Sequence, residues 1–333
     1  TNTFAAVFRV RSVAAQAVHR YFHERGYYYI NTPLITASDC EGAGEMFRVT
    51  TQSWDAKYES EEAYYRDDFF GKKAGLSVSG QLEGEVAATA LGRIYTFGPS
   101  FRAENSNTTR HLAEFWHIEP EIAFAELPDV LEVAEEMVKY LIRAVLSECP
   151  EEIAFFDKFM EPGLKDKLTH VAESEFGVLD YTEAIEILKK ADKEFKFPVE
   201  WGCDLQTEHE RYITEEVFKK PVFVVNYPKE IKSFYMKQNA DGKTVAAADL
   251  LVPGIGEIIG GSEREADPDK LLAAMKARGM DLSAYEQYIS LRTFGTVPHG
   301  GFGLGFERFV MYVTGMENIR DVTLFPRTVK NII

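Results

Sequence analysis

The sequence predicts an α+β fold in which helices pack on an antiparallel sheet. Strand candidates cluster early and late in the chain, without the regular alternation with helices that is typical of a parallel sheet. Hydrophobic residues make up 45% of the 333 residues, and no low-complexity linker divides the chain. This length allows one large domain or two small ones. No apolar run reaches the roughly 18 residues that a membrane span needs.

The charge and the cysteines limit the classes of function. A formal net charge of −16, from 53 acidic and 37 basic residues, disfavours nonspecific coating of nucleic acid, which depends on neutralising phosphates. A local basic cleft is still compatible with it. Cys40, Cys149 and Cys203 are far apart and odd in number, so we expect neither a disulfide framework nor a cysteine-rich zinc site. They favour a protein of the reducing cytoplasm.

The first predicted elements are a helix and a short strand. Val7, Val10 and further apolar residues recur at helical spacing over residues 4–25, which predicts an amphipathic helix. Gly26 ends this helix, and residues 27–30 form a strand candidate that stops before a proline.

A hairpin and a long helix follow. Residues 93–104 and 114–124 predict two strands, and the polar, basic loop between them is longer than a tight turn needs. A helix is expected from Pro128 to about Leu146. Residues 150–220 are acidic and mixed, and we expect them to be mostly helical.

The last third predicts strands, two helices, a glycine-rich segment and a final helix. The strand candidates are residues 221–227, 233–237, 244–251 and 255–259, the two helices span about 268–292, the glycine-rich segment is 295–305, and the final helix is 306–314.

Several familiar motifs fail. The glycine run that starts at Gly254 has Ile259 where a dinucleotide fingerprint needs glycine, and no P-loop follows. His209 begins like a zinc-protease helix, but Ile213 stands where the second histidine is required. His19 lies one helical turn from His23 without a third metal ligand, which favours surface or interface histidines.

The loop of the predicted hairpin favours binding of a nucleoside triphosphate. Arg102, Arg110 and His111 can hold phosphates, since the planar fork of arginine bonds two oxygens at once. Phe115 can stack on a base, and Glu104 can accept a hydrogen bond from an exocyclic amine. A salt-bridged surface hairpin is the alternative, and the spacing alone does not separate the two.

A second segment favours the phosphate site. Residues 299–305 are rich in glycine, which lets the backbone approach a ligand closely, and Arg308 stands at the start of a helix. Pro33, residues 101–104 and residues 303–308 resemble motifs 1, 2 and 3 of the class II aminoacyl-tRNA synthetases, in that order. Three motifs in order are a much stronger signal than one.

The resemblance becomes specific in the segments between these motifs. Residues 41–47, 79–85, 102–115 and 256–265 resemble those of the bacterial-type asparaginyl-tRNA synthetases, and the resemblance covers nearly the whole chain. It implies a class II synthetase-type antiparallel sheet flanked by helices, with residues 1–333 as the catalytic domain. Members of this family usually also carry an N-terminal β-barrel that reads the anticodon, and we expect that domain to be absent here.

The resemblance assigns residues to ATP. Arg102 would bind the α-phosphate and Glu104 the adenine amine, while Phe115 and Arg308 would sandwich the adenine. His111 and Arg308 would reach the γ-phosphate. The residues assigned to ATP are Arg102, Glu104, Arg110, His111, Phe115, Glu257 and Arg308, with Arg102, His111 and Arg308 as the catalytic ones.

The resemblance also assigns a Mg²⁺ site to Asp249 and Glu257. This matches the habit of the ion, which takes one or two carboxylates together with phosphate oxygens and waters. Some relatives carry a serine where this sequence has Gly260, so a third protein ligand is not expected.

For the amino acid, the resemblance places Glu41 and Gln81 on the α-ammonium. It places Arg264 on the side-chain oxygen and Tyr235 in the same pocket. The alternative for Glu41 and Gln81 is that they only solvate a loop.

The residues at positions 84 and 85 distinguish specificity for asparagine from specificity for aspartate. The aspartate enzymes carry a lysine where this sequence has Gly84, and the next residue, Glu85, could accept a hydrogen from an amide NH₂, directly or through water. The same carboxylate would repel a second carboxylate.

We therefore expect an asparagine–tRNA ligase that forms AMP. It would be a cytoplasmic homodimer that uses ATP and Mg²⁺, binds L-asparagine and the acceptor end of tRNA(Asn), and touches no membrane. Two alternatives stand beside it. One is a truncated paralog that makes free asparagine from aspartate and ammonia through an adenylate. The other is a non-catalytic dimeric regulator.

Overall fold

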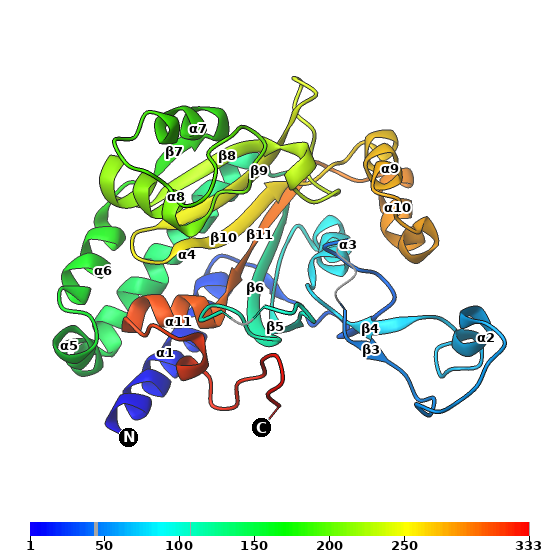
Figure 1. Cartoon of the computed structure of the whole chain (residues 1–333), viewed down its shortest axis with the longest axis horizontal. Helices are drawn as coiled ribbons and strands as arrows, with labels where there is room; N and C mark the ends of the chain where they lie inside the picture. Colours follow the sequence, from blue (N-terminus) through cyan, green and yellow to red (C-terminus); the bar gives the residue numbers. More distant parts are fainter. Residues whose placement is uncertain (43–45, 107, 333) are drawn as a thin grey trace.

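The computed structural model describes residues 1–42, 46–106 and 108–332. These residues form an eight-stranded sheet in the order β1-β5-β6-β11-β10-β9-β8-β7 (Figure 1). Neighbouring strands are antiparallel, except that β1 and β7 pair in parallel with β5 and β8 at the two edges. The strands are β1 (Tyr28–Tyr29), β5 (Arg93–Phe101), β6 (Glu114–Ala123), β7 (Gly177–Asp180), β8 (Val222–Pro228), β9 (Thr244–Val252), β10 (Gly256–Glu263) and β11 (His299–Gly305). The predicted α+β architecture is confirmed.

The larger hydrophobic core lies between this sheet and a layer of helices. Its apolar side chains come from the sheet and from α1 (Asn2–Glu24), α4 (Leu127–Glu148), α5 (Pro150–Phe159), α6 (Leu164–Glu173) and α11 (Phe306–Thr314). The apolar stripe predicted along the first helix is buried here, since Val7, Val10 and Ala14 have no exposed surface. These helices cover one face of the sheet, which leaves the other face of its central strands free to carry a site.

A second hydrophobic cluster lies toward β8 and β9. Residues from α7 (Tyr181–Lys189), α9 (Pro268–Ala277) and α10 (Glu286–Thr293) pack there. Helix α3 (Gln81–Leu91) packs against β5 and β6. Figure 1 shows a smaller sheet to one side of the body, together with α2 (Glu61–Arg66). Its strand order is β2 (Ile35–Thr36), β4 (Ala74–Leu76) and β3 (Arg48–Val49).

Two expectations about elements are corrected. Residues 233–237 do not form a strand, because only Met236 makes an isolated bridge, to Arg264. Residues 150–220 contain the expected helices, including α8 (Thr207–Arg211) and a π-helical turn (Tyr212–Val217), but also β7, which extends the main sheet. Short 3₁₀ turns occur at Lys229–Ile231, Leu282–Tyr285 and Ile319–Val322. Among the residues described, no helix has both the length and the apolar character required to cross a bilayer.

Candidate active site

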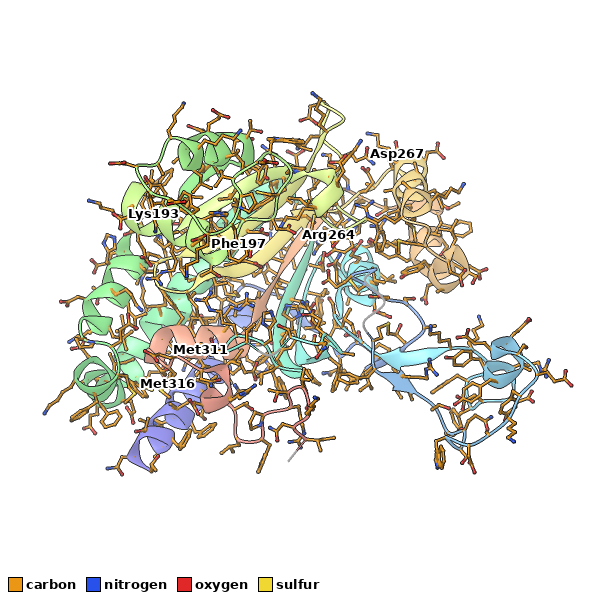
Figure 2. The ribbon with its side chains drawn as sticks, viewed as in Figure 1. Lys193, Phe197, Arg264, Asp267, Met311 and Met316 are labelled. Atoms are coloured by element: carbon orange, nitrogen blue, oxygen red, sulfur yellow. The ribbon has the colours of Figure 1, made fainter. Side chains whose placement is uncertain are left out.

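A cavity of about 770 Å³ opens over the central strands β6, β11, β10 and β9. Strand β6 provides much of its floor, because side chains alternate between the two faces of a strand. Phe115, His117, Glu119 and Glu121 therefore lie in a row along the cavity. Figure 2 shows Arg264 where β10 ends, on the side of the sheet toward α9 and α10.

The cavity brings together almost every residue that the sequence singled out. Those that line it are Glu41, Gln81, Arg102, Glu104, Arg110, His111, Phe115, Tyr235, Asp249, Glu257, Arg264 and Arg308. Glu85 is the exception. Residues 43–45 and 107, which belong to the segments compared above, lie outside the described residues.

One end of the cavity is rich in arginine, and we call the part around Arg102, Arg110 and Arg308 the arginine end. Arg102 follows β5, and its main-chain N–H donates to the carbonyl of Ala113 across the hairpin at 2.9 Å. Its guanidinium lies 5.4 Å from the centre of the Phe115 ring and 3.9 Å from Glu104. The cation, the aromatic ring and the carboxylate expected from the hairpin are therefore adjacent.

The other two arginines are held by main-chain oxygens. Arg110 donates to the carbonyl of Ile255 at 2.5 Å, and Arg308 donates to the carbonyl of Glu257 at 3.0 Å. Burial and the nearby Arg308 lower the pKa of His111, so the imidazole is mostly neutral at pH 7. A neutral imidazole beside several guanidinium groups forms a surface suited to a polyanion with several phosphates.

Two carboxylates converge at the middle of the cavity. Asp249 on β9 and Glu257 on β10 both approach Gly260, whose Cβ position would lie 3.7 Å from Asp249 Oδ1 and 3.5 Å from Glu257 Oε1. The ammonium of Lys232 donates to Asp249 Oδ2 at 2.5 Å. Burial and the like charge of Asp249 raise the pKa of Glu257. The mutual repulsion of these carboxylates is what a bound divalent cation would relieve, so the pair suits Mg²⁺. Within the described residues, no group of three or more His, Cys, Asp or Glu side chains is arranged to hold a metal.

The opposite end is built from buried charged groups, and we call the part around Glu119, Glu121 and Arg264 the carboxylate end. Arg264, only 3% exposed, forms an ion pair with Glu121 and donates to Ser262 Oγ at 2.8 Å. Burial raises the pKa of Glu121 to about 6, although Arg264 opposes this shift. Tyr235 lines the same end, with its ring 5.2 Å below the guanidinium of Arg264.

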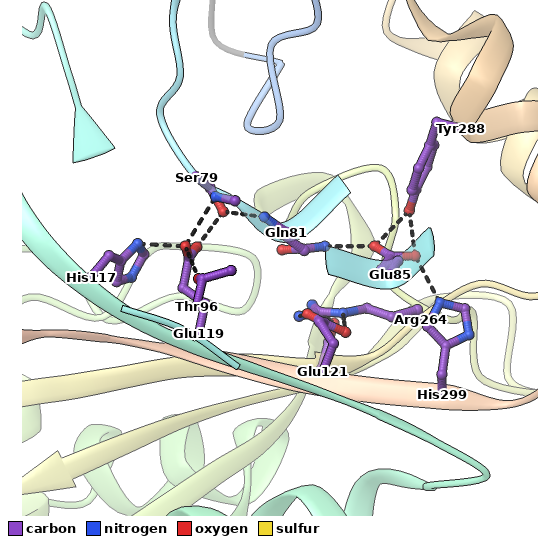
Figure 3. A network of polar contacts seen from close by, with 12 residues as sticks. Ser79, Gln81, Glu85, Thr96, His117, Glu119, Glu121, Arg264, Tyr288 and His299 are labelled. Atoms are coloured by element: carbon purple, nitrogen blue, oxygen red, sulfur yellow. Dashed lines mark hydrogen bonds and ion pairs between the residues drawn. The ribbon is translucent and has the colours of Figure 1, made fainter. Parts of the chain in front are cut away.

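Glu119 is held more tightly than Glu121. It accepts hydrogen bonds from the Gly80 main chain at 2.9 Å, from Thr96 at 3.1 Å and from the hydroxyl of Ser79. Figure 3 shows Thr96 and Ser79 beside this carboxylate. His117 Nδ1 lies 3.1 Å from Oε1, the oxygen that also accepts from Ser79, whereas Gly80 and Thr96 donate to Oε2. Burial opposes ionisation, but His117 and these donors lower the pKa of Glu119 to about 2. Its carboxylate is therefore charged at neutral pH.

Glu41 joins the two ends. One of its oxygens lies 3.5 Å from Arg102 Nη2, and the other accepts from Ser233 Oγ at 3.3 Å. Its carboxylate thus lies between the arginine end and the Gln81 side of the cavity, where a small cation could meet it.

The expectation for Glu85 is corrected. Its side chain has no exposed surface, it is not among the residues that line the cavity, and its oxygens are bonded to Gln81, Tyr288, Arg292 and His299. It therefore lies behind Gln81 and does not reach a substrate amide. The reason is that α3 begins at Gln81, so a residue four positions later lies one turn deeper, on the same face of the helix.

Sequence reasoning missed His117, Glu119, Glu121 and Lys232. The first three could have been found, because they follow Phe115 at a spacing of two within a predicted strand. Lys232 carries no such signal. It comes from an irregular segment that only the tertiary fold brings to Asp249.

Comparison with known proteins identifies the class. Residues 1–329 match the family "tRNA synthetases class II (D, K and N)", so the chain belongs to this family. Its sequence is 60% identical over 330 residues to "Asparagine--tRNA ligase" of Clostridium novyi, and the aligned region covers 98% of this chain and 71% of that protein. It is 62% identical over 333 residues to the protein of the same name in Desulfitobacterium hafniense, and that alignment covers 99% of this chain and 72% of the relative.

Solved structures agree with this. The asparaginyl-tRNA synthetase of Pyrococcus horikoshii in complex with asparaginyl-adenylate has a TM-score of 0.86 and 39% identity, over 99% of this chain and 70% of that one. The aspartyl-tRNA synthetase of Entamoeba histolytica has a TM-score of 0.77 and 25% identity, over 99% and 59%. The chain therefore has the fold shared by both branches and the higher sequence identity to the asparagine branch.

Proposed function

We propose that this chain activates L-asparagine with ATP and transfers it to tRNA(Asn). The observation that carries the proposal is one cavity with a polyanion-binding arginine end and an amino-acid-sized carboxylate end. The identity of about 60% to proteins named asparagine–tRNA ligase supports the same reaction. Both alternatives are less favoured, since those relatives are ligases and the arginine end keeps every side chain that the chemistry needs.

The triphosphate is proposed to lie along the arginine end. Phe115 stacks on the adenine, Glu104 accepts from its amine, and Arg308 covers the opposite face. Arg102 lies on the α-phosphate, where negative charge builds up during attack, and Arg110 and His111 meet the outer phosphates. Preorganised charged donors of this kind stabilise the transition state more than the ground state.

The reaction needs little covalent help from the protein. The α-carboxylate of asparagine is ionised at neutral pH, so no general base is needed to make it a nucleophile. It attacks the α-phosphorus in line, a phosphorus–oxygen bond to the leaving pyrophosphate breaks, and asparaginyl-adenylate forms. Positioning by Glu41 and Arg102 on either side of the reacting atoms is then the main contribution.

Mg²⁺ is proposed to bind at Asp249 and Glu257. The convergence of their oxygens beside Gly260 supports this, because a side chain at position 260 would fill the space between them. When bound, the ion supplies charge neutralisation for the phosphates. Lys232 is placed to orient Asp249 toward it.

The carboxylate end is proposed to bind the amino acid. Glu41 and the side-chain oxygen of Gln81 accept hydrogens from the α-ammonium, and Arg264 donates to the side-chain oxygen. The two acids that line this end, Glu119 and Glu121, favour the neutral amide of asparagine over a second carboxylate. This replaces Glu85 as the basis of selectivity.

The chain is further proposed to act as a homodimer in the cytoplasm. Tyr28, Tyr29, Leu34 and Ile35 are exposed apolar side chains on and after the edge strand β1, which suits a surface that a second copy covers. The tRNA acceptor end would reach the cavity beside the hairpin loop.

An exchange assay tests the proposal. The protein is mixed with ATP, labelled pyrophosphate, Mg²⁺ and asparagine, and label in ATP is followed. We expect label to appear in ATP only when asparagine is present, and the amino acid to pass to tRNA(Asn) when it is added. A folded protein without asparagine-dependent exchange would favour the non-catalytic regulator.

A further inference from the structure

A group of buried polar side chains lies directly behind the carboxylate end. It consists of Glu85 on α3, Tyr288 and Arg292 on α10, and His299 at the start of β11, and we call it the Glu85 cluster. Figure 3 shows Glu85, Tyr288 and His299 side by side. Their exposed fractions are between 0 and 4%. Two elements, α10 and β11, thus direct polar groups at the Glu85 carboxylate of α3, which is not among the residues that line the cavity.

The carboxylate of Glu85 is surrounded by donors. Oε2 accepts from Arg292 Nη2 at 2.5 Å and lies 2.7 Å from His299 Nε2. Tyr288 donates its hydroxyl hydrogen to this carboxylate, with distances of 2.9 Å to Oε1 and 3.1 Å to Oε2. Burial opposes ionisation, but Arg292 and His299 lower the pKa of Glu85. The group is therefore an anion at neutral pH and can only accept hydrogen bonds.

The fourth donor is Gln81, which lines the cavity. Its Nε2 lies 3.0 Å from Glu85 Oε1. The oxygen and nitrogen of a carboxamide have the same shape, so their order is decided by what each one faces. Because Glu85 accepts and cannot donate, the NH₂ group of Gln81 must face it. The carbonyl oxygen of Gln81 is then the atom available to a ligand.

The cluster is also tied to the residues on the other side of the pocket. Arg292 Nε donates to the carbonyl of Glu265 at 3.0 Å, and the main-chain N–H of Glu265 donates to the carbonyl of Tyr235 at 2.7 Å. Glu265 directly follows Arg264 in sequence. A shift of α10 would therefore move Glu85 and the Arg264 segment together.

We propose that Glu85 is a positioning residue that fixes the carboxamide of Gln81, so that an acceptor oxygen faces the ammonium group of the amino acid. Arg292 supports it by compensating the buried charge. This inference rests on the proposed function, because it assumes that the α-ammonium binds at Gln81. A structural role alone would not need these charges, since a buried ion pair is commonly replaced by apolar groups without loss of stability.

The first test uses Glu85→Gln, which keeps the shape but removes the charge. Its carboxamide can offer either oxygen or NH₂ to Gln81, so Gln81 would no longer be held in one orientation. We expect KM for asparagine to rise about tenfold to hundredfold, as for loss of one hydrogen bond to a charged group, and KM for ATP to stay within twofold. Glu135→Gln on α4 is the matched control, since it also removes a carboxylate bonded to a cation and lies away from the cavity. Its KM for asparagine should not change.

A double-mutant cycle distinguishes positioning from general damage. If Glu85 acts through Gln81, then adding Glu85→Gln to Gln81→Ala should raise KM for asparagine by less than about twofold further. The swapped pair, Gln81→Glu with Glu85→Gln, reverses the hydrogen bond but keeps an acceptor oxygen toward the ammonium. Its KM for asparagine should be lower than that of Gln81→Ala.

Several results would overturn the inference. One is an unchanged KM for asparagine in Glu85→Gln, and another is a rise in KM for ATP as large as that for asparagine. A third is a double mutant whose rise in KM for asparagine equals the product of the rises in the two single mutants. If Glu85→Gln does not fold, Glu85→Asp decides, since it keeps the buried charge but shortens the side chain that holds Gln81; an unchanged KM for asparagine in that variant contradicts positioning. Failure of the proposed function is distinguishable, because the parent chain would then show no asparagine-dependent exchange at all.

Discussion

At the arginine end of the cavity, the side chains are partly exposed, and each makes only a few polar contacts. Arg102 is 33% exposed, and its charged neighbours Glu41 and Glu104 lie at 3.5 and 3.9 Å. At the carboxylate end, Arg264 is 3% exposed and paired with Glu121, and Glu119 accepts from several donors. Glu85, directly behind this end, also accepts from several donors. The comparison indicates that one end is left open to meet a charged, solvated ligand, while the other is fixed before the ligand arrives.

The largest expected effect on activity is at the arginine end, which is the open one. Arg102→Ala removes the cation proposed at the α-phosphate, and its few neighbours are surface-accessible, so the fold should survive. We expect the exchange rate to fall by about 10² to 10³, as for loss of a preorganised donor to the transition state. Melting temperature and exchange rate are measured together. A rate within about threefold of the parent would remove Arg102 from the mechanism.

The second-largest effect is expected at the carboxylate end, which is the fixed one. The Cβ position of Gly84 lies 3.5 Å from Glu121 Cγ, so Gly84→Lys would send an ammonium toward Glu121 in competition with Arg264. We expect asparagine-dependent exchange to fall at least about tenfold, the loss of one charge-assisted bond, with KM for ATP unchanged.

Gly84→Ala is the matched control. Its methyl would make ordinary contacts, and alanine is favoured over glycine within a helix by about 1 kcal/mol. Exchange within about twofold of the parent is expected. If the lysine variant behaved like the alanine variant, then Glu121 and Arg264 could not be the groups that hold the substrate side chain.

A smaller effect is expected from Phe115→Leu. Leucine keeps an apolar surface but loses the ring that stacks on a base, which contributes about 1–3 kcal/mol in comparable sites when removed entirely. We expect KM for ATP to rise about fivefold, equivalent to about 1 kcal/mol. KM for asparagine should not change, since Phe115 lies at the other end. A rise in KM for asparagine alone would break the division between the two ends.

The smallest expected effect concerns stability and pH. Burial tends to lower the pKa of His299, but the bond to Glu85 outweighs it and the pKa is raised. The folded state therefore holds a proton that the unfolded state releases near pH 6.5, so this stabilisation is complete below that pH. It is lost as pH rises through the raised pKa, by up to about 1.4 kcal/mol per pH unit.

His299→Asn should remove this dependence. Urea unfolding between pH 6 and pH 9 would show a flatter change in the free energy of unfolding than in the parent. Parallel curves for the two proteins would mean that His299 is not protonated in the folded state.

The sequence predicted the open end better than the fixed end. Arg102, Glu104, Arg110, His111 and Phe115 come from one hairpin, so their proximity follows from local structure. Motif 3 supplied Arg308, and the resemblance of residues 256–265 supplied Glu257. The antiparallel sheet was also predictable, because its long strands show clear patterns between turn signals.

The fixed end could not be predicted in the same way. Glu85 meets Arg292 across 207 positions and His299 across 214, and no local pattern encodes such contacts. Glu85 was therefore placed one turn too close to the substrate. The row of Glu119 and Glu121 on β6 was predictable in principle, since it needs only the alternation of a strand.

The most direct test of the account is the ratio of asparagine-dependent to aspartate-dependent exchange, measured as kcat/KM on the unmodified chain at pH 7. A fixed, acid-lined pocket should reject a second carboxylate, so we expect asparagine to be preferred by about 10² or more. Exchange that is equal for the two, or faster with aspartate, would contradict the account. It would favour instead the paralog that makes free asparagine.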